Sequence, residues 1–235
     1  MELVESSAFW IGLLKIVWVN IMLSGDNVVV IALASHSLPS SQQKKAVIFG
    51  SAAAIVLRVI LTIFAVQLLQ LPWLKAMGAV LLVWIGIQLL TDDTEERHFN
   101  EASNLISAIK IIVVADLVMS LDNVLAVAAA ADNAPPQARL ILVALGLGLS
   151  IPVVIFGSGI VLKLMKRFPM IVTLGAMLIG WIAGEMLAKE EIVAIYTHSS
   201  VALQTLFSIA GALFVLAIGK FKLRRIRSGT PAPGE

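Results

Sequence analysis

Seven long apolar stretches, separated by short polar segments, divide the chain. They cover roughly residues 8–34, 46–69, 73–90, 105–131, 139–162, 169–188 and 201–219. A helix that crosses a bilayer needs about 20 mostly apolar residues, so each stretch is long enough to form one spanning helix. The pattern therefore predicts an all-α, polytopic protein with a single membrane domain and seven transmembrane helices.

Composition and charge support this interpretation. Of the 235 residues, 59% are hydrophobic and only 14% are charged, whereas about 25% are charged in soluble domains. Cysteine is absent, which excludes disulfides, thiolate metal sites and thiol catalysis. The basic residues gather beside the predicted spans, where lipid headgroups and topology account for them. We expect the lipid bilayer, and no nucleic acid, as the partner of this charge.

The distribution of Lys and Arg predicts the orientation. With the N-terminus outside, the inner segments hold twelve of them: Lys44, Lys45, Arg97, Lys110, Lys163, Lys166, Arg167, Lys220, Lys222, Arg224, Arg225 and Arg227. The outer segments hold only Lys75, Arg139 and Lys189. Because cytoplasmic loops carry the excess of positive charge, we predict N-out and C-in. The polar loop 91–104 and the basic tail 220–235 are then cytoplasmic.

An internal repeat links the two halves of the chain. Residues 20–34, "NIMLSGDNVVVIALA", align without gaps to residues 116–130, "DLVMSLDNVLAVAAA". A second pair, 71–90 and 168–187, shares a glycine and a tryptophan in register. The chain is therefore predicted to contain two related units and one additional helix.

The units, 8–90 and 105–188, each contain three predicted helices, and 201–219 is the seventh. Three is odd, so the second unit crosses the membrane in the opposite sense and the repeats are inverted. Inverted repeats are typical of secondary transporters, whose sites lie at the repeat interface near the midplane. Duplication for packing alone is the alternative.

Polar residues recur within the first and fourth predicted helices. The spacing i, i+4, i+7 places three of them on one helix face in each repeat: Asn20, Ser24 and Asn27, then Asp116, Ser120 and Asn123. Asp26 and Asp122 sit about 100° around the helix from these stripes, so each needs a partner to the side or a local unwinding. Gly25 permits unwinding in the first repeat, whereas Leu121 at the matching position does not.

These side chains favour a particular class of ligand. A charge at bilayer depth costs about 2.5 to 3.5 kcal/mol on insertion scales, so buried carboxylates are rarely idle. Carboxylate, amide and hydroxyl oxygens suit hard or intermediate cations such as Mn²⁺, Mg²⁺ and Ca²⁺, and suit Cu⁺ or Zn²⁺ less well. We expect such an ion as the transported substrate and no prosthetic group. Metal binding that displaces protons links ion and proton movement.

Arg58 and Glu185 are two further charged candidates within the predicted spans, and Pro152 is a candidate for a helix break. Arg58, in the second helix, lies at a depth comparable to Asp26, which predicts an ion pair between them. That pair is either a fixed structural salt bridge or a gate in which Arg58 occupies the cation site when metal is absent. Glu185, near the outer end of the sixth helix, is either an outer-gate ligand or an interfacial carboxylate.

The repeated motif carries a family resemblance. "NIMLSGDNVVVIALAS" and "ADLVMSLDNVLAVAAAAD", in two inverted three-helix units with a seventh helix, resemble the TerC family of integral membrane proteins in its compact branch. The resemblance implies Mn²⁺ efflux across the bacterial cytoplasmic membrane and association with membrane-protein export machinery. It also implies that the motif residues are metal ligands: Asp26, Asn27, Asp122 and Asn123. An amide, Asn20, precedes the motif in the first repeat, and an acid, Asp116, precedes it in the second.

Three functions remain as hypotheses. The first is a secondary transporter, not an enzyme, that exports divalent cations in exchange for protons or Na⁺. The second is an assembly or metalation partner without transport activity. The third is an intramembrane aspartyl protease built on Asp26 and Asp122, since paired carboxylates can share acid and base roles; the duplicated Asp-Asn pair argues against it. The sequence leaves homo-oligomer formation open.

Overall fold

The computed structural model describes the backbone of residues 7–22, 24–64, 73–91, 101–131, 136–197 and 200–227. These residues form nine α-helices and no strand: α2 (Ser7–Met22), α3 (Gly25–His36), α4 (Ser40–Ile63), α6 (Leu74–Thr91), α7 (Glu101–Ala131), α8 (Pro136–Arg167), α9 (Met170–Ala188), α10 (Glu191–Thr197) and α11 (Val201–Arg227). Helix therefore occupies each of the predicted stretches, and the all-α fold is confirmed for this part of the chain.

The first predicted helix is broken. In place of one helix over 8–34, α2 ends at Met22 and α3 begins at Gly25, with Ser24 in a turn between them. Glycine disfavours the helix interior by about 1 kcal/mol relative to alanine, and the amide of Ser24 bonds back to the carbonyl of Ile21 at 3.2 Å. A single unbroken first helix was wrong, while the unwinding expected at Gly25 is confirmed.

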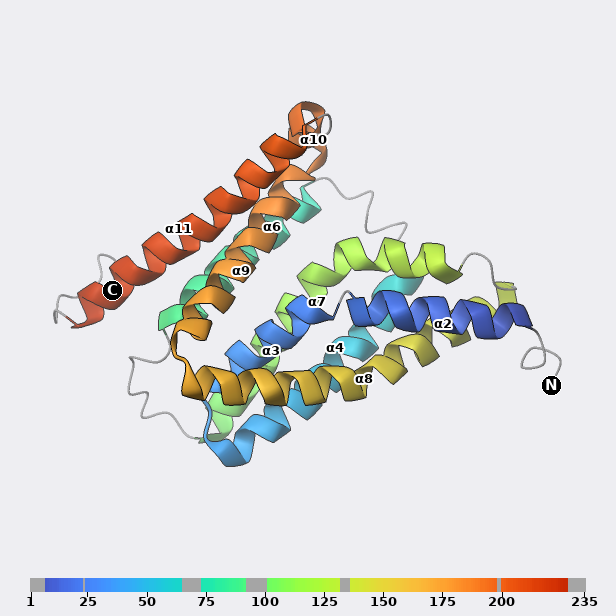
Figure 1. The fold of residues 1–235 in the computed structure, drawn as a ribbon, viewed down its shortest axis with the longest axis horizontal. Coiled ribbons are helices and arrows are strands. Elements are labelled where there is room, and N and C mark those ends of the chain that lie inside the picture. Colours follow the sequence, from blue (N-terminus) through green and yellow to red (C-terminus); the bar gives the residue numbers. More distant parts are fainter. Residues whose placement is uncertain are drawn as a thin grey trace.

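The matching helix of the second repeat is continuous. Helix α7 runs through Leu121 without interruption, although its direction changes along its course (Figure 1). Helix α8 is also continuous and contains Pro152 in its interior. The break expected at Pro152 was wrong, because loss of a single N–H donor leaves the hydrogen bonds of the neighbouring turns to hold α8 together.

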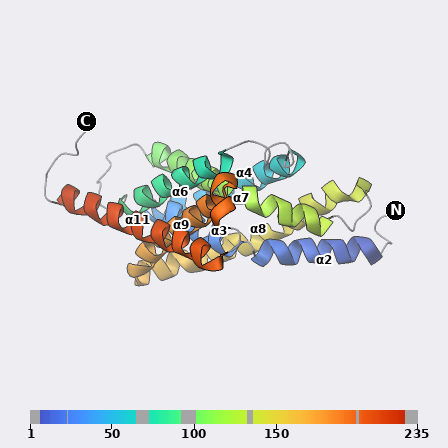
Figure 2. The ribbon, with the colours of Figure 1, turned by 90° about the horizontal axis from the view of Figure 1, so that it is seen from above.

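The helices are arranged in two groups around α3. In the first group α6, α9 and α11 pack together. In the second group α4 packs along α7 and α8, and α8 also packs along α2 and α3. Helices α2 and α11 lie at opposite ends of the molecule in both ribbon views (Figures 1 and 2). Helices α9 and α11 approach closely because Gly180 and Gly184 face Gly211, leaving no space for a Cβ atom.

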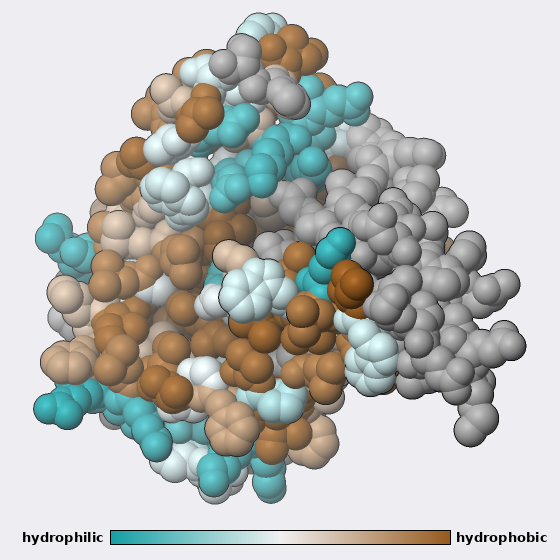
Figure 3. Space-filling view, turned by 45° about the vertical axis from the view of Figure 1, so that its right-hand side comes forward, coloured by the Kyte–Doolittle hydropathy of each residue, from teal (hydrophilic) through white to brown (hydrophobic). Residues whose placement is uncertain are grey.

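An apolar core joins α3, α6, α7, α8 and α9, and Leu82, Ile85, Ile112 and Ile179 are fully buried within it. Apolar side chains also cover much of the face shown in Figure 3, and hydrophilic residues gather in a band across its upper part and along its left and lower edges. Within the residues that the structure describes, three helices are long and apolar enough to cross a bilayer by their length and composition: α6, α9 and α11. These features fit a polytopic membrane protein; the count of seven spans, the inverted relation and the orientation stay predictions.

Candidate functional site

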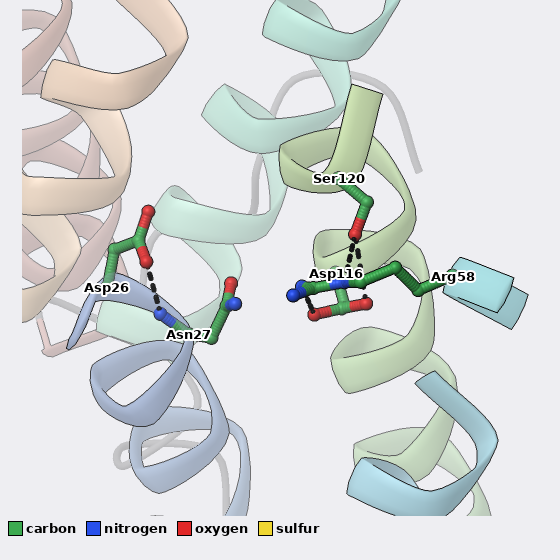
Figure 4. Close-up of polar contacts among 5 residues, drawn as sticks. All are labelled: Asp26, Asn27, Arg58, Asp116 and Ser120. Atoms are coloured by element: carbon green, nitrogen blue, oxygen red, sulfur yellow. Dashed lines mark hydrogen bonds and ion pairs between the residues drawn. The ribbon is translucent and has the colours of Figure 1, made fainter. Parts of the chain in front are cut away.

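A buried ion pair connects α4 and α7. The Arg58 guanidinium donates through Nη2 to Oδ1 of Asp116, and through Nε to Oγ of Ser120 at 2.8 Å. The Ser120 hydroxyl donates in turn to Oδ2 of Asp116 at 3.2 Å. All three residues are less than 9% exposed, so the charges neutralise each other away from solvent. Figure 4 shows this triad facing the first turn of α3.

Asp26 is not the partner of Arg58, which corrects the predicted ion pair. It lies on the far side of Asn27 from the Arg58–Asp116 pair (Figure 4). Consecutive helical residues point about 100° apart, so when Asn27 faces the pair, Asp26 does not. Oδ1 of Asp26 accepts the Asn27 backbone N–H at 2.8 Å. Its position in the first turn of α3 is where a helix favours negative charge.

A small cavity adjoins the triad. It measures about 20 Å³ and is lined by residues of α3, α4, α7 and α8, together with Ser24: Ser24, Asn27, Ile31, Ser51, Ala54, Ile55, Arg58, Asp116 and Val154. A cavity needs about 10–15 Å³ to hold a single water, so this space matches one water molecule or one ion. Polar groups from both repeats meet in it.

Ser51 is a site residue that the sequence analysis did not find. It is 2% exposed and lines the cavity, and its hydroxyl has no hydrogen-bond partner within the part of the chain that the structure describes. The signal was available, since Ser51 and Arg58 are seven residues apart and therefore share one face of α4.

The other predicted site residues fall into two groups. Ser24, Asn27, Asp116 and Ser120 are placed by the structure at the cavity or in the triad beside it. The side chains of three others lie outside the described residues, although their backbones belong to α2 and α7: Asn20, Asp122 and Asn123. Among the side chains that are described, no three His, Asp or Glu residues come together as a metal-binding group.

Glu185 is separate from this cavity. Its Oε1 forms an ion pair with Nζ of Lys189 at 2.8 Å, and both side chains are more than 40% exposed. The same end of α9 is tied to α6, because Oε2 of Glu190 accepts the backbone N–H of Ala76 at 2.9 Å. The structure thus places Glu185 in an exposed ion pair, and its role as an outer-gate ligand or an interfacial carboxylate stays a prediction.

The arrangement presents oxygen atoms around a positive charge supplied by the protein itself. Asp116, Ser120, Ser51 and Asn27 offer carboxylate, hydroxyl and amide oxygens, the ligand types that hard divalent cations prefer. The guanidinium of Arg58 now neutralises the buried carboxylate of Asp116. A cation that binds Asp116 would therefore compete with Arg58 for the carboxylate oxygens, because the two positive charges repel each other.

Comparison with known proteins gives the family. Residues 5–227 match the integral membrane protein TerC family. The chain is 37% identical over 208 residues to the uncharacterized membrane protein YjbE of Bacillus subtilis, covering 88% of this chain and 93% of that protein. It is 26% identical over 212 residues to the uncharacterized membrane protein YkoY of the same organism, covering 80% and 64%.

A more distant relative comes from another bacterium. The UPF0053 inner membrane protein YgdQ of Escherichia coli is 24% identical over 155 residues, covering 58% of this chain and 65% of that protein. No solved structure matches the chain. The match over nearly the whole length, together with the helical fold and its apolar surface, shows that this chain is a member of the TerC family of integral membrane proteins.

Proposed function

We propose that this protein is a secondary transporter that exports divalent metal cations, Mn²⁺ in particular, from the bacterial cytoplasm. Protons or Na⁺ move in exchange, and the protein carries out no catalysis. The observation that supports this most directly is the meeting of Asn27, Ser51, Arg58 and Asp116 at one cavity of ionic size. Intramembrane ionisable residues that face a cavity typically mark ion pathways.

Arg58 has a gating role in this proposal. In the ion-free state its guanidinium holds Asp116 in place of a metal, at no cost in unpaired buried charge. An arriving divalent ion competes for the same carboxylate, so the Arg58 side chain must leave when the ion enters. The partner of Arg58 is thus Asp116 of the fourth predicted helix in place of Asp26 of the first. The proposed mechanism, in which the cation and the guanidinium alternate at one carboxylate, stays the same.

The packing of the helices supports the inverted repeat on which the mechanism depends. Helix α4 packs along α7, while α8, its counterpart in the second unit, packs along α2 and α3, the counterparts of α7. The break before Gly25 resembles the discontinuous helices that form transporter sites. Seven spans with N-out and C-in orientation, in the bacterial cytoplasmic membrane, complete the proposal.

Manganese uptake into inside-out vesicles tests this function. Asp116→Asn removes the charge that binds the cation, and we expect it to abolish uptake. Glu185→Gln is the matched control, since it removes a carboxylate that pairs with the exposed Lys189 and lies outside the cavity; it should transport like the unaltered protein. Asp26→Ala combined with Asp122→Ala tests the motif acids in the same assay.

Two results would count against transport through this cavity. One is unchanged uptake by Asp116→Asn protein that elutes as a folded species in size-exclusion chromatography. The other is binding of Mn²⁺ without flux in the unaltered protein. The second result, with co-purification of export machinery, would favour an assembly or metalation partner instead.

A further inference from the structure

A second and much larger cavity lies apart from the polar site. It measures about 630 Å³ and opens between the first turns of α4 and the last turns of α8. Its lining contains three lysines, several apolar side chains and no carboxylate. None of its residues belongs to the cavity beside Asp116. We refer to it below as the α4–α8 groove.

The basic residues lie at one end of the groove. Lys44 is in the second turn of α4, and Lys163 and Lys166 are in the last turns of α8. Lys166 reaches across to α4, where its Nζ donates to Oε1 of Gln43 at 3.0 Å and lies 3.3 Å from Oγ of Ser40. Both helix ends therefore direct positive charge and hydrogen-bond donors toward the same mouth.

The remainder of the groove is apolar. On α4, Val47 and Ile48 follow one turn after Lys44, and on α8, Phe156 and Ile160 precede Lys163 by one or two turns. Phe156 is 74% exposed and Ile160 is 65% exposed. On both helices the surface thus changes from cationic at the helix end to apolar toward the helix middle.

This gradient matches the chemistry of one kind of occupant. A free anion would use the lysines and leave the apolar part exposed, whereas an apolar peptide would leave the lysines without a counterion. A phospholipid carries a negative phosphate at one end and acyl chains at the other. Basic pockets between membrane helices on the cytoplasmic side bind anionic headgroups, and the predicted orientation places this mouth on that side.

We propose that the α4–α8 groove binds an anionic phospholipid from the surrounding bilayer. Its headgroup phosphate lies among Lys44, Lys163 and Lys166, and one acyl chain follows Phe156 and Ile160. Gly159 leaves room for that chain, because a Cβ atom placed on it would meet nothing within 4 Å. The proposal concerns a site separate from the cation cavity and does not depend on the transported ion.

Native mass spectrometry of the purified full chain tests the proposal with two lipids. We expect phosphatidylglycerol to remain bound, and phosphatidylcholine of the same chain length to bind much more weakly. The triple variant Lys44→Gln, Lys163→Gln, Lys166→Gln should bind phosphatidylglycerol about a hundredfold more weakly, since each lysine near an anionic headgroup contributes several-fold. A triple variant of the basic end of α11 should bind normally: Lys220→Gln, Lys222→Gln and Arg224→Gln.

A second variant blocks the groove without changing its charge. Gly159→Leu fills the apolar part, and we expect it to weaken phosphatidylglycerol binding while the lysines remain. Gly148→Leu is the matched control on the same helix, because its Cβ position is also open but lies outside the groove. Both leucine variants favour helix formation, so both should elute as folded protein.

Three outcomes would overturn the proposal. Equal binding of the two lipids would show that the groove does not recognise the headgroup charge. Normal binding of phosphatidylglycerol by the lysine triple variant would show that the lipid binds at another surface. The third outcome combines two results: millimolar inorganic phosphate displaces bound phosphatidylglycerol as effectively as added phosphatidylglycerol does, and Gly159→Leu binds the lipid normally. Together they would show that the site takes a free anion and no acyl chain.

Discussion

The same Ser-x-Asp-Asn motif occurs in both repeats, but the backbone around it differs. In the first repeat the chain breaks between α2 and α3, and Gly25 starts a new helix. In the second, α7 passes without interruption through Leu121 at the corresponding position. A duplicated sequence has therefore adopted two local structures, and the four-residue motif differs between them in one residue, glycine against leucine.

The two repeats also stabilise their carboxylates differently. Asp26 lies in the first turn of α3, where the backbone N–H of Asn27 and the positive end of the helix favour its charge. Asp116 lies within a continuous helix and has no helix terminus nearby, so it is neutralised by Arg58 from α4. A helix break and an ion pair are thus alternative ways of holding an acid inside an apolar protein.

Removal of Arg58 should have the largest effect on this comparison. In Arg58→Gln the carboxylate of Asp116 stays buried without its counterion, which costs about 3 to 5 kcal/mol of stability. We expect a large fall in the thermal unfolding midpoint in detergent, and substantial recovery when Asp116→Asn is added. If Asp26→Asn restored stability equally well, the assignment of the two acids would be wrong.

Manganese should partly replace the missing guanidinium. A ligand that binds only the folded protein raises its apparent stability, by an amount that grows with the logarithm of its affinity, and Arg58 no longer competes in Arg58→Gln. Added Mn²⁺ should therefore raise the unfolding midpoint of Arg58→Gln more than that of the unaltered protein. A midpoint in Arg58→Gln that does not respond to Mn²⁺ would separate the triad from cation binding.

Substitutions at Gly25 and Leu121 should change the free energy of forming a continuous helix by about 1 kcal/mol. Gly25→Ala fits the open space around Gly25 and favours helix across residues 22–26. We expect backbone amides there to exchange with deuterium about fivefold more slowly, as measured by mass spectrometry. Leu121→Gly is the converse variant and should speed exchange in α7. Unchanged exchange in Gly25→Ala would mean that packing, and not glycine, produces the break.

Neutralising the acid of the broken helix should have a smaller effect. Asp26→Asn removes the interaction of a carboxylate with a helix N-terminus, which contributes about 0.3 to 1 kcal/mol, and it also removes the cost of burying that charge. The two effects oppose each other and the Arg58–Asp116 pair stays intact, so denaturant unfolding should detect only a small change, well below the loss in Arg58→Gln. A loss as large as that of Arg58→Gln would indicate that Asp26 and Arg58 are coupled.

The smallest change in stability is expected for Ser51→Ala. Its hydroxyl is buried with no hydrogen-bond partner in the described structure, so alanine should leave stability equal or higher by up to about 1 kcal/mol. Manganese transport should nevertheless weaken if Ser51 serves the ion. Ser35→Ala is the control, since the Ser35 hydroxyl is likewise buried and without a hydrogen-bond partner in the described structure, yet lies outside the cavity. Equal transport by both variants would remove Ser51 from the site.

The sequence by itself determined the helices and the polar stripes. Apolar length set the position of the long helices, because a long apolar segment must satisfy its backbone internally, but it did not predict the short α10. Periodicity placed Ser24 with Asn27, and Asp116 with Ser120, on common faces. Gly25 marked the place of the break, because it is the position at which the two copies of the motif differ.

Only the tertiary structure decided which charges meet. Counting depth from helix ends suggested Asp26 as the partner of Arg58, but depth says nothing about rotation around the helix axis. Packing turned Asn27 toward α4 and brought Asp116 to Arg58. The same packing selected Ser51 for the cavity and left Glu185 outside it, in an exposed ion pair. Partner choice depends on contacts between helices far apart in sequence, which no local pattern specifies.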